Sequence, residues 1–445
     1  MRFRSCLCRA IFVVALVTVS GAAVADRLPD ILLISVDTLR ADRVSSYGYE
    51  RHTSPRIDEL LGRGLRFVQA RTPTPLTAPA MASVMTSLEP HEHGSTRNGI
   101  RVRPNLAAFT SFLERRGYET AAFVGNWTLK PELSGLDEHF ETYVTILNRK
   151  RWFGLAKSEA TADDINAEAL EWLANREKEG PFLLWVHYVE PHAPYQLQKE
   201  FMPQIGLKGS GTLSLNKRYD SEVAFVDDRV GKFLDSAGDQ IDLDETLVVF
   251  LSDHGESLGE RGYWGHGRHL YEVTLHVPMG VVWPGRIPTR TIDEPASLLD
   301  VGPTILGLIG LPVPSHFQGY DWSQIVSGDE TPNADRVTWH QAHKASVQPK
   351  ENIEKLRRRG LLEVGKVEQG RKEIFKVATG RLRIFDLQQD PAEKKNLASE
   401  GKRPSSVLRT WRKQLEAALE RADELPPPSL SDDDIAALKA LGYID

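Results

Sequence analysis

The sequence predicts an α/β protein: a doubly wound, mostly parallel sheet flanked by helices, followed by a small C-terminal α+β subdomain with an antiparallel sheet. First, apolar runs alternate with amphipathic segments over roughly 300 residues, the pattern of parallel strands joined by helices. Second, these apolar runs are nearly continuous, as expected of strands buried on both faces. Third, charged residues become dense and strand-like runs short beyond about residue 332.

The predicted main domain begins with the strand 30–37, whose sequence DILLISVD is apolar between two aspartates. Segment 54–64 is predicted as a short helix, because Ser54 is a capping residue, a proline follows it and a glycine stands near the end. A strand-like stretch at 66–70 leads to a predicted helix at 78–87. The same reasoning predicts helices at 106–117, 161–180, 219–238 and 297–310, and strands at 118–125, 182–190, 246–253 and 277–285.

The C-terminal part is predicted to form smaller units. The runs EIFKVA and LRIFDLQQD, at 373–378 and 382–390, look like a pair of antiparallel strands. Segment 405–424 is an amphipathic helix that precedes a proline-rich linker and a last short helix. The predicted divisions are a catalytic domain at 26–332, an antiparallel subdomain at 333–400 and a helical tail at 401–445.

Residues 1–25 are laid out like a signal peptide. Arg2 and Arg4 precede an apolar run from Ala10 to Val19, and small residues close it in AVAD. We therefore expect cleavage after Ala25 and an exported protein, periplasmic or secreted. The alternative is an uncleaved membrane anchor, although the run is short for a membrane span. After cleavage no stable membrane span is expected.

Cysteine usage and charge exclude several classes of site. Both cysteines, Cys6 and Cys8, lie before the apolar run, so the mature chain is expected to contain none. Disulfides, thiolate metal sites and cysteine nucleophiles are therefore excluded. The net charge of -6 gives no sign of nucleic-acid binding.

Polar side chains gather where the predicted strands end. In open α/β sheets ligands bind outside the carboxyl ends of the strands, so residues at these positions are candidates for a site. They are Asp37, His187 with His192 just beyond it, Asp253 with His254, and Thr77 at the start of a predicted helix.

Oxygen ligands with one imidazole suit a hard or borderline divalent cation, namely Ca, Mg or Mn, with Zn as a further option. Asp37, Asp253 and His254 supply such ligands, and Thr77 is the natural fourth. A threonine hydroxyl is a poor nucleophile until a metal lowers its pKa. The start of a helix also favours an anion. Together these features point to a sulfuryl or phosphoryl group as the target.

Each residue also has an ordinary structural explanation. Thr77 caps its helix in the commonest case, and Asp37 caps the segment that follows. The SDHGES stretch is then a loop that needs a glycine turn, and His192 is a packed loop histidine. Asn126, in NWT, is a glycosylation sequon only in a glycosylating host and otherwise marks a turn. The coincidence of four strand ends favours a site over four unrelated caps.

Five stretches, which follow one another over about 400 residues, resemble motifs of the sulfatase family of the alkaline phosphatase superfamily. ILLISVDTLRADRVSSYGY resembles the first metal strand, and TPLTAPAMASVMTSLEPHEHG the signature helix. WVHYVEPHAPY resembles the substrate-contacting loop, and VVFLSDHGESLGERGYWGHGRHLYEVTLHVPM the second metal loop with its continuation. FDLQQDPAEKKNLA and the closing LGY resemble the C-terminal subdomain and tail.

The resemblance implies that a metal is held by Asp37, Asp253 and His254 and touches the nucleophile. It implies substrate contacts from His192, His266 and His187. It also implies that the large α/β domain is followed by a four-stranded antiparallel subdomain.

The signature differs from the family's at the residues that do the chemistry. Family members oxidise a Cys or Ser to formylglycine, whereas this position is Thr77. Oxidation of threonine gives a ketone, so no formylglycine is expected. The signature arginine is Met81, and the Gly-Arg that usually follows the helix is Ser87-Leu88. Thr38 replaces the second aspartate of the usual pair.

An unmodified Thr77 beside a metal resembles the phosphoryl-transferring branches of the superfamily. We therefore expect a metal-dependent hydrolase of sulfate or phosphate and phosphonate esters, with phosphorus favoured. His192 and His266 are expected to contact the ester or protonate the leaving group. The expected partner is a small-molecule, glycan or lipid-headgroup anionic ester. The alternatives are a lapsed enzyme that only binds an anionic glycan or lipid headgroup, and a phospho-group transferase.

Overall fold

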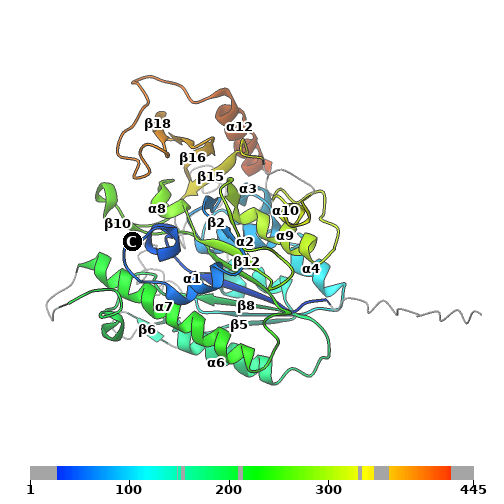
Figure 1. Cartoon of the computed structure of the whole chain (residues 1–445). Helices are drawn as coiled ribbons and strands as arrows, with labels where there is room; N and C mark the ends of the chain where they lie inside the picture. Colours follow the sequence, from blue (N-terminus) through cyan, green and yellow to red (C-terminus); the bar gives the residue numbers. More distant parts are fainter. Residues whose placement is uncertain are drawn as a thin grey trace, which may run out of the picture.

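The computed structural model describes residues 28–147, 149–151, 156–208, 214–328, 333–344 and 360–421. These residues form an α/β domain with a smaller antiparallel sheet against it (Figure 1). The predicted signal peptide and the last predicted helix lie outside the described residues, and the predicted domain boundaries stay predictions. Among the described residues, no helix combines the length and apolarity needed to cross a membrane.

The main sheet has eight strands in the order β13-β2-β12-β9-β1-β8-β4-β5. The central strand β1 pairs in parallel with both β8 and β9. Strand β12 runs antiparallel to β9, so the sheet is mostly rather than wholly parallel. The strands are β1 (Ile31–Val36), β2 (Leu65–Phe67), β4 (Glu119–Val124), β5 (Thr142–Thr145), β8 (Phe182–Tyr188), β9 (Leu247–Ser252), β12 (Met279–Val282) and β13 (Arg290–Ile292).

Helices cover both faces of this sheet because successive side chains of a strand point to opposite sides. Ile31 and Leu33 of β1 belong to one apolar core, and Leu32 and Ile34 belong to the other. The first core packs against α2 (Thr77–Thr86), α4 (Phe109–Glu114) and α9 (Val301–Leu308). The second packs against α1 (Pro55–Leu61), α6 (Ala162–Ala174) and α7 (Leu215–Gly238). The predicted doubly wound fold class is therefore confirmed.

Shorter elements complete the described chain. The helices and 3-10 turns are η1 (Ala41–Arg43), η2 (Ser45–Tyr47), α3 (Pro90–His93), η3 (Trp127–Leu129), α5 (Pro131–Ser134), η4 (Leu136–His139), η5 (Lys199–Phe201), η6 (Glu260–Gly262), α8 (Glu272–Leu275), η7 (Leu298–Asp300) and α10 (Ser323–Ser327). The short strands are β3 (Ala70–Arg71), β6 (Arg149–Arg151), β7 (Ala156–Glu159), β10 (Ser257–Leu258), β11 (Trp264–Gly265) and β14 (Ala296–Ser297).

The C-terminal sheet is antiparallel, in the order β15-β16-β17-β18. Its strands are β15 (Thr338–His343), β16 (Leu361–Glu368), β17 (Arg371–Lys376) and β18 (Arg381–Asp386). The last two are the pair that the sequence predicted. Helix α12 (Ser406–Arg421) packs apolar residues such as Leu408 and Leu415 against this sheet. Ile374 and Phe385 join a separate cluster with Leu270 of the main domain.

Two local expectations need correction. Ser54 occupies the position before α1 but makes no capping hydrogen bond. Asp227 of α7 takes over, because its carboxylate accepts the N–H groups of Arg56 and Ile57 at 3.2 and 2.8 Å. Helix α6 ends at Ala174 rather than near residue 180, because the charged residues that follow have no apolar face to bury.

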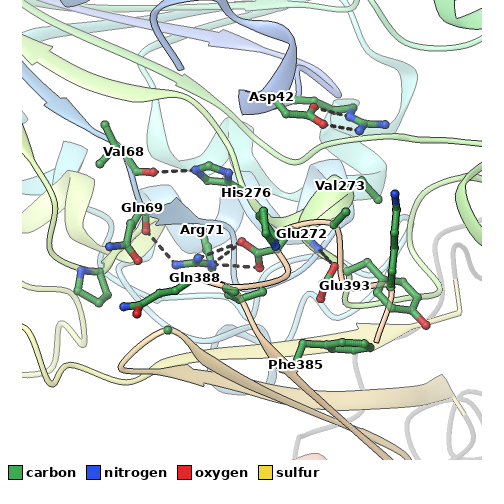
Figure 2. A pocket seen from close by; sticks show the side chains of 18 of the residues that line it. Asp42, Val68, Gln69, Arg71, Glu272, Val273, His276, Phe385, Gln388 and Glu393 are labelled. Atoms are coloured by element: carbon green, nitrogen blue, oxygen red, sulfur yellow. Dashed lines mark hydrogen bonds and ion pairs between the residues drawn. The ribbon is translucent and has the colours of Figure 1, made fainter. Parts of the chain in front are cut away.

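A buried ion network joins the C-terminal sheet to the main domain beside a cavity of about 1420 Å³ (Figure 2). Glu272 of α8 pairs with Arg71 at 2.9 Å and with Lys372 of β17 at 2.8 Å. Lys372 also lies 3.0 Å from Glu393, whose carboxylate accepts the Glu272 backbone N–H. Because Lys372 is fully buried, its charge is compensated only by these partners.

Replacement of the buried lysine should therefore weaken the docking of the two parts. We expect Lys372→Met to lower the free energy of unfolding by about 3 kcal/mol, because it leaves buried carboxylates without their cation. The measurement is denaturant unfolding followed by circular dichroism. Lys376→Met, on an exposed side chain of the same strand, is the matched control. Equal stability of the two variants would contradict the role given to the network.

Candidate active site

Three neighbouring strands place three ligand-type side chains together. In the register of the sheet, Val36 of β1 lies beside Ser252 of β9, and Ser35 lies beside His187 of β8. Asp37 and Asp253 are the next residues after β1 and β9, so their side chains meet at the same edge. One ligand atom from each of Asp37, His187 and Asp253 lies within 4.8 Å of the others, and all three residues are buried.

The turn after β1 is held in an unusual backbone conformation. Thr38 has a φ of 56°, which costs energy for a β-branched residue. This conformation aims the Thr38 N–H at Asp253 Oδ1, 3.1 Å away. Tyr219 of α7 supports the turn, since its hydroxyl donates to the Thr38 carbonyl at 2.7 Å and accepts the Arg40 N–H at 3.0 Å. The strained turn thereby links the loop that carries Asp37 to the loop that carries Asp253.

Thr77 is the first residue of α2, but it does not cap the helix. Leu76 occupies the capping position, and no side-chain capping hydrogen bond is formed. The capping explanation for Thr77 is therefore wrong. Its hydroxyl is fully buried and lies 3.3 Å from His254 Nε2.

The proton positions on His254 follow from its partner. Its Nδ1 lies 3.0 Å from the Gly255 carbonyl, which can only accept, so Nδ1 carries a proton. Burial, followed by the charge of His266, holds the pKa of His254 well below its usual range, so the ring is neutral and Nε2 presents a lone pair. That nitrogen lies 3.5 Å from Asp253 Oδ2 and 3.7 Å from Asp37 Oδ1.

The His254 nitrogen and the two carboxylate oxygens thus face one another, an arrangement that a cation among them would stabilise. Burial raises the pKa of Asp253 to about 7, although the Thr38 and His254 backbone N–H groups oppose the effect. Asp253 Oδ2 makes no hydrogen bond within the described residues. The donor set of carboxylates and neutral imidazole therefore fits a divalent cation.

His187 is also suited to act as a metal ligand. Its Nδ1 lies 2.8 Å from Ser35 Oγ, and Ser35 Oγ also accepts the Trp185 indole N–H. Burial, with the charge of His192, lowers the pKa of His187 to about 3. Its Nε2 has no hydrogen-bond partner in the described part of the chain. The resemblance implied a substrate contact for this residue, whereas the geometry brings it to the two aspartates.

His192 and His266 lie beside this group. The ring centroids of His254 and His266 are 4.4 Å apart, and those of His192 and His266 are 5.3 Å apart. His266 Nδ1 lies 3.1 Å from Glu256 Oε1. Burial raises the pKa of Glu256, but the charge and hydrogen bond of His266 outweigh it, so the pKa stays below its usual range. A charged Glu256 therefore holds the Nδ1 proton of His266 and fixes the orientation of its ring.

Two asparagines complete the site, and the sequence patterns gave no signal for either role. Asn126 does stand at a turn, because its side chain caps η3, but its Nδ2 also donates to Asp37 Oδ2. Asn98 Oδ1 accepts the N–H of Ala78, the residue after Thr77, at 3.2 Å. Asn98 Nδ2 is buried and has no partner among the described residues. Neither contact is local, so only the fold brings these amides to the site.

The positions of the missing arginines are filled differently. Met81 is fully buried in the apolar core of one sheet face. Leu88, at the second arginine position, is buried as well, and Ser87 before it donates its hydroxyl to the Leu299 carbonyl at 2.8 Å. Neither position offers a cation to a bound anion.

The comparisons with known proteins agree with this fold. The family model "Sulfatase" matches residues 29–311, and the model "N-sulphoglucosamine sulphohydrolase, C-terminal" matches residues 259–421. The chain therefore belongs to the sulfatase family of the alkaline phosphatase superfamily. Its class is that of sulfuric or phosphoric ester hydrolases.

The similar proteins include enzymes with both kinds of ester in their names. Choline-sulfatase of Rhizobium meliloti is 25% identical over 84% of this chain and 83% of its own length. A solved chain in complex with its substrate D-glucosamine-2-N,6-O-disulfate has a TM-score of 0.69 and 18% identity, covering 91% of this chain and 100% of its own. Phosphonate monoester hydrolase of Agrobacterium radiobacter has a TM-score of 0.68 and 18% identity, covering 88% and 96% respectively.

The contact between Asn126 and Asp37 is testable. We expect Asn126→Ala to weaken binding of a divalent cation by roughly 10- to 100-fold, because a ligand that loses its supporting hydrogen bond is less well oriented. Calorimetric titration of the chelator-treated protein measures this affinity. Asn175→Ala, at an exposed helix end, serves as the control. Unchanged affinity in a folded Asn126→Ala protein would rule out the supporting role.

Proposed function

We propose that this protein is an exported, metal-dependent hydrolase that cleaves phosphate or phosphonate esters in preference to sulfate esters, with Thr77 as nucleophile. The observation that carries the proposal is the cluster in which the Thr77 hydroxyl lies 3.3 Å from a neutral His254 imidazole that faces two buried aspartates. Export rests on the signal-like residues 1–25.

A divalent cation would be held by Asp37, Asp253 and His254, with Thr77 beside it and His187 as a further ligand candidate. When bound, it supplies positive charge that acidifies the Thr77 hydroxyl and stabilises the anionic ester. With that charge present, the two carboxylates stay ionised and the imidazoles stay neutral. Asn126 keeps Asp37 oriented for this role.

The reaction proceeds in two half-steps. The Thr77 alkoxide forms a bond to phosphorus, the bond from phosphorus to the leaving oxygen breaks, and His266 Nε2 gives that oxygen a proton. Water then attacks the phosphorus of phospho-threonine and gives a proton back to His266. The bond to Thr77 Oγ1 breaks, which restores the alkoxide and releases the phosphate or phosphonate.

The preference for phosphorus follows from the residues around Thr77. Threonine cannot yield the aldehyde whose hydrate expels sulfate, so resolution of the intermediate requires attack at its central atom. The signature positions of the family offer Met81 and Leu88 in place of cations. The buried amide of Asn98 beside the start of α2 provides a neutral donor to one ester oxygen instead.

A second candidate function is binding of an anionic glycan or lipid headgroup without turnover. It is favoured by the burial of Met81 in the apolar core, which leaves the signature arginine without a substitute there. The intact cluster of Asp37, Asp253 and His254 favours the hydrolase. A cation held there would activate the Thr77 hydroxyl, and binding alone requires no activated hydroxyl.

Removal of the nucleophile separates the two functions. We expect Thr77→Ala to reduce metal-dependent cleavage of p-nitrophenyl phenylphosphonate at least a thousandfold, since the covalent route is lost. The readout is steady-state release of p-nitrophenol in the presence of Mn, Mg, Ca or Zn. Thr77→Ser, which keeps a hydroxyl, should retain activity. p-Nitrophenyl phosphate and p-nitrophenyl sulfate run in parallel test the preference for phosphorus.

Several outcomes would count against the hydrolase. A Thr77→Ala protein as active as the wild type would exclude Thr77 as nucleophile. Bound metal with no turnover on the phosphate, phosphonate and sulfate esters would favour the binding function. Faster cleavage of the sulfate would reverse the stated preference.

The pairing of Glu256 with His266 makes a separate prediction. We expect Glu256→Gln to lower kcat by roughly 10- to 100-fold for leaving groups of high pKa and much less for p-nitrophenol, which needs little protonation. Comparing phenyl esters of graded leaving-group pKa measures this dependence. Equal losses for all leaving groups would show that Glu256 has only a structural role.

A further inference from the structure

A second concave region lies on the C-terminal subdomain, away from the catalytic cluster. Its volume is about 910 Å³, and it lies between the turn that joins β17 to β18 and the start of α12. We call it the basic pocket. Its charged lining residues are one carboxylate, Glu400, and six cations, namely Arg381, Lys402, Arg403, Arg409, Arg412 and Lys413.

The charge of this region differs in sign from that of the whole chain. Residues 360–421 contain fourteen Lys and Arg against nine Asp and Glu, whereas the complete sequence has a net charge of -6. Positive charge lining a concave wall of low dielectric attracts anions more strongly than the same charge on a flat surface.

Most of these cations are not neutralised by the protein. Arg412 pairs with Glu416 at 3.3 Å and lies against the Phe375 ring at 4.9 Å, so its position is fixed. Arg409 donates to the backbone carbonyl of Pro404 and to no carboxylate among the described residues. The remaining four cations form no ion pair with any part of the chain that the structure describes.

The pocket is too large for a single anionic group. Its cations come from the strand β18, the loop before α12 and the helix itself, so one sulfate or phosphate cannot meet them all. A chain that carries several anionic groups matches this distribution.

We propose that the basic pocket binds a segment of a polyanionic glycan remote from the ester that is cleaved. This proposal rests on the proposed function in one respect, because the glycan is taken to carry the ester that Thr77 attacks. Strand β15 runs beside the segment that leads to Thr77, since Gln341 N–H donates to the Pro73 carbonyl at 2.9 Å. Strand β18 is the opposite edge of the same four-stranded sheet. Three strand spacings separate them, about 14 Å, so only an extended chain reaches from one region to the other.

The binding test uses the full-length protein and heparin as a sulfated-glycan probe. We expect the triple variant Lys402→Glu, Arg403→Glu, Lys413→Glu to bind heparin at least tenfold more weakly than the wild type. The matched control is Arg115→Glu, Arg116→Glu, Lys208→Glu, which makes the same charge change at exposed sites of the main domain. The control should retain most of the wild-type affinity. Equal losses in both triple variants, or no heparin binding by the wild type, would overturn the proposal.

Two further probes decide the kind of polyanion. Phosphatidylglycerol vesicles represent a membrane surface, and single-stranded DNA represents a nucleic acid. Pocket-dependent binding that is tighter for either of them than for heparin would overturn the assignment to a glycan.

Cleavage of p-nitrophenyl phenylphosphonate is measured on the same proteins. We expect it to be unchanged in the pocket variant, because its residues do not touch the catalytic cluster. Absence of this activity in the wild type would count against the proposed function, whereas the heparin comparison alone decides whether the pocket binds glycan. The two failures are therefore distinguishable.

Discussion

The site depends on electrostatic repulsion among buried side chains at the edge of the main sheet. The parallel strands β1, β8 and β9 end side by side, and their register brings Asp37, His187 and Asp253 within 4.8 Å of one another in a fully buried position. Buried carboxylates facing neutral imidazole nitrogens repel one another unless positive charge is supplied. A divalent cation would supply that charge, and the carboxylate and imidazole donors fit one.

Hydrogen bonds also fix the loops around this cluster. The strained Thr38 turn and the buried Arg40 guanidinium tie the loop after β1 to the loop after β9, and the Tyr219 hydroxyl ties the turn to α7. Arg40 donates to the Glu256 carbonyl, and the Glu256 side chain in turn holds His266. Backbone strain of this kind persists where the surrounding contacts over-determine it, and it is concentrated at functional sites. The loop that carries His266 and the loops that carry Asp37 and Asp253 are therefore held in one connected frame.

The differences from the sulfatase signature form a consistent set. A family member that uses formylglycine needs an oxidisable nucleophile and cations for a sulfate, and this chain has Thr77, Met81 and Leu88 at the matching positions. The Thr77 hydroxyl lies 3.3 Å from the His254 imidazole, and the Asn98 amide accepts the N–H of the residue after Thr77. These contacts support the proposed preference for phosphorus esters, whose intermediate is resolved by attack at phosphorus.

The sequence by itself determined the α/β class, the strand ends that carry Asp37, Asp253 and His254, and Thr77 at a helix start, because strand periodicity and helix signals are local properties. It did not reveal Asn98, Asn126 or Glu256, and it placed His187 with the substrate rather than beside the aspartates. Those contacts join residues that are 10 to more than 150 positions apart. They depend on which strands are neighbours, and only tertiary packing, through the non-local burial of both sheet faces, decides that order.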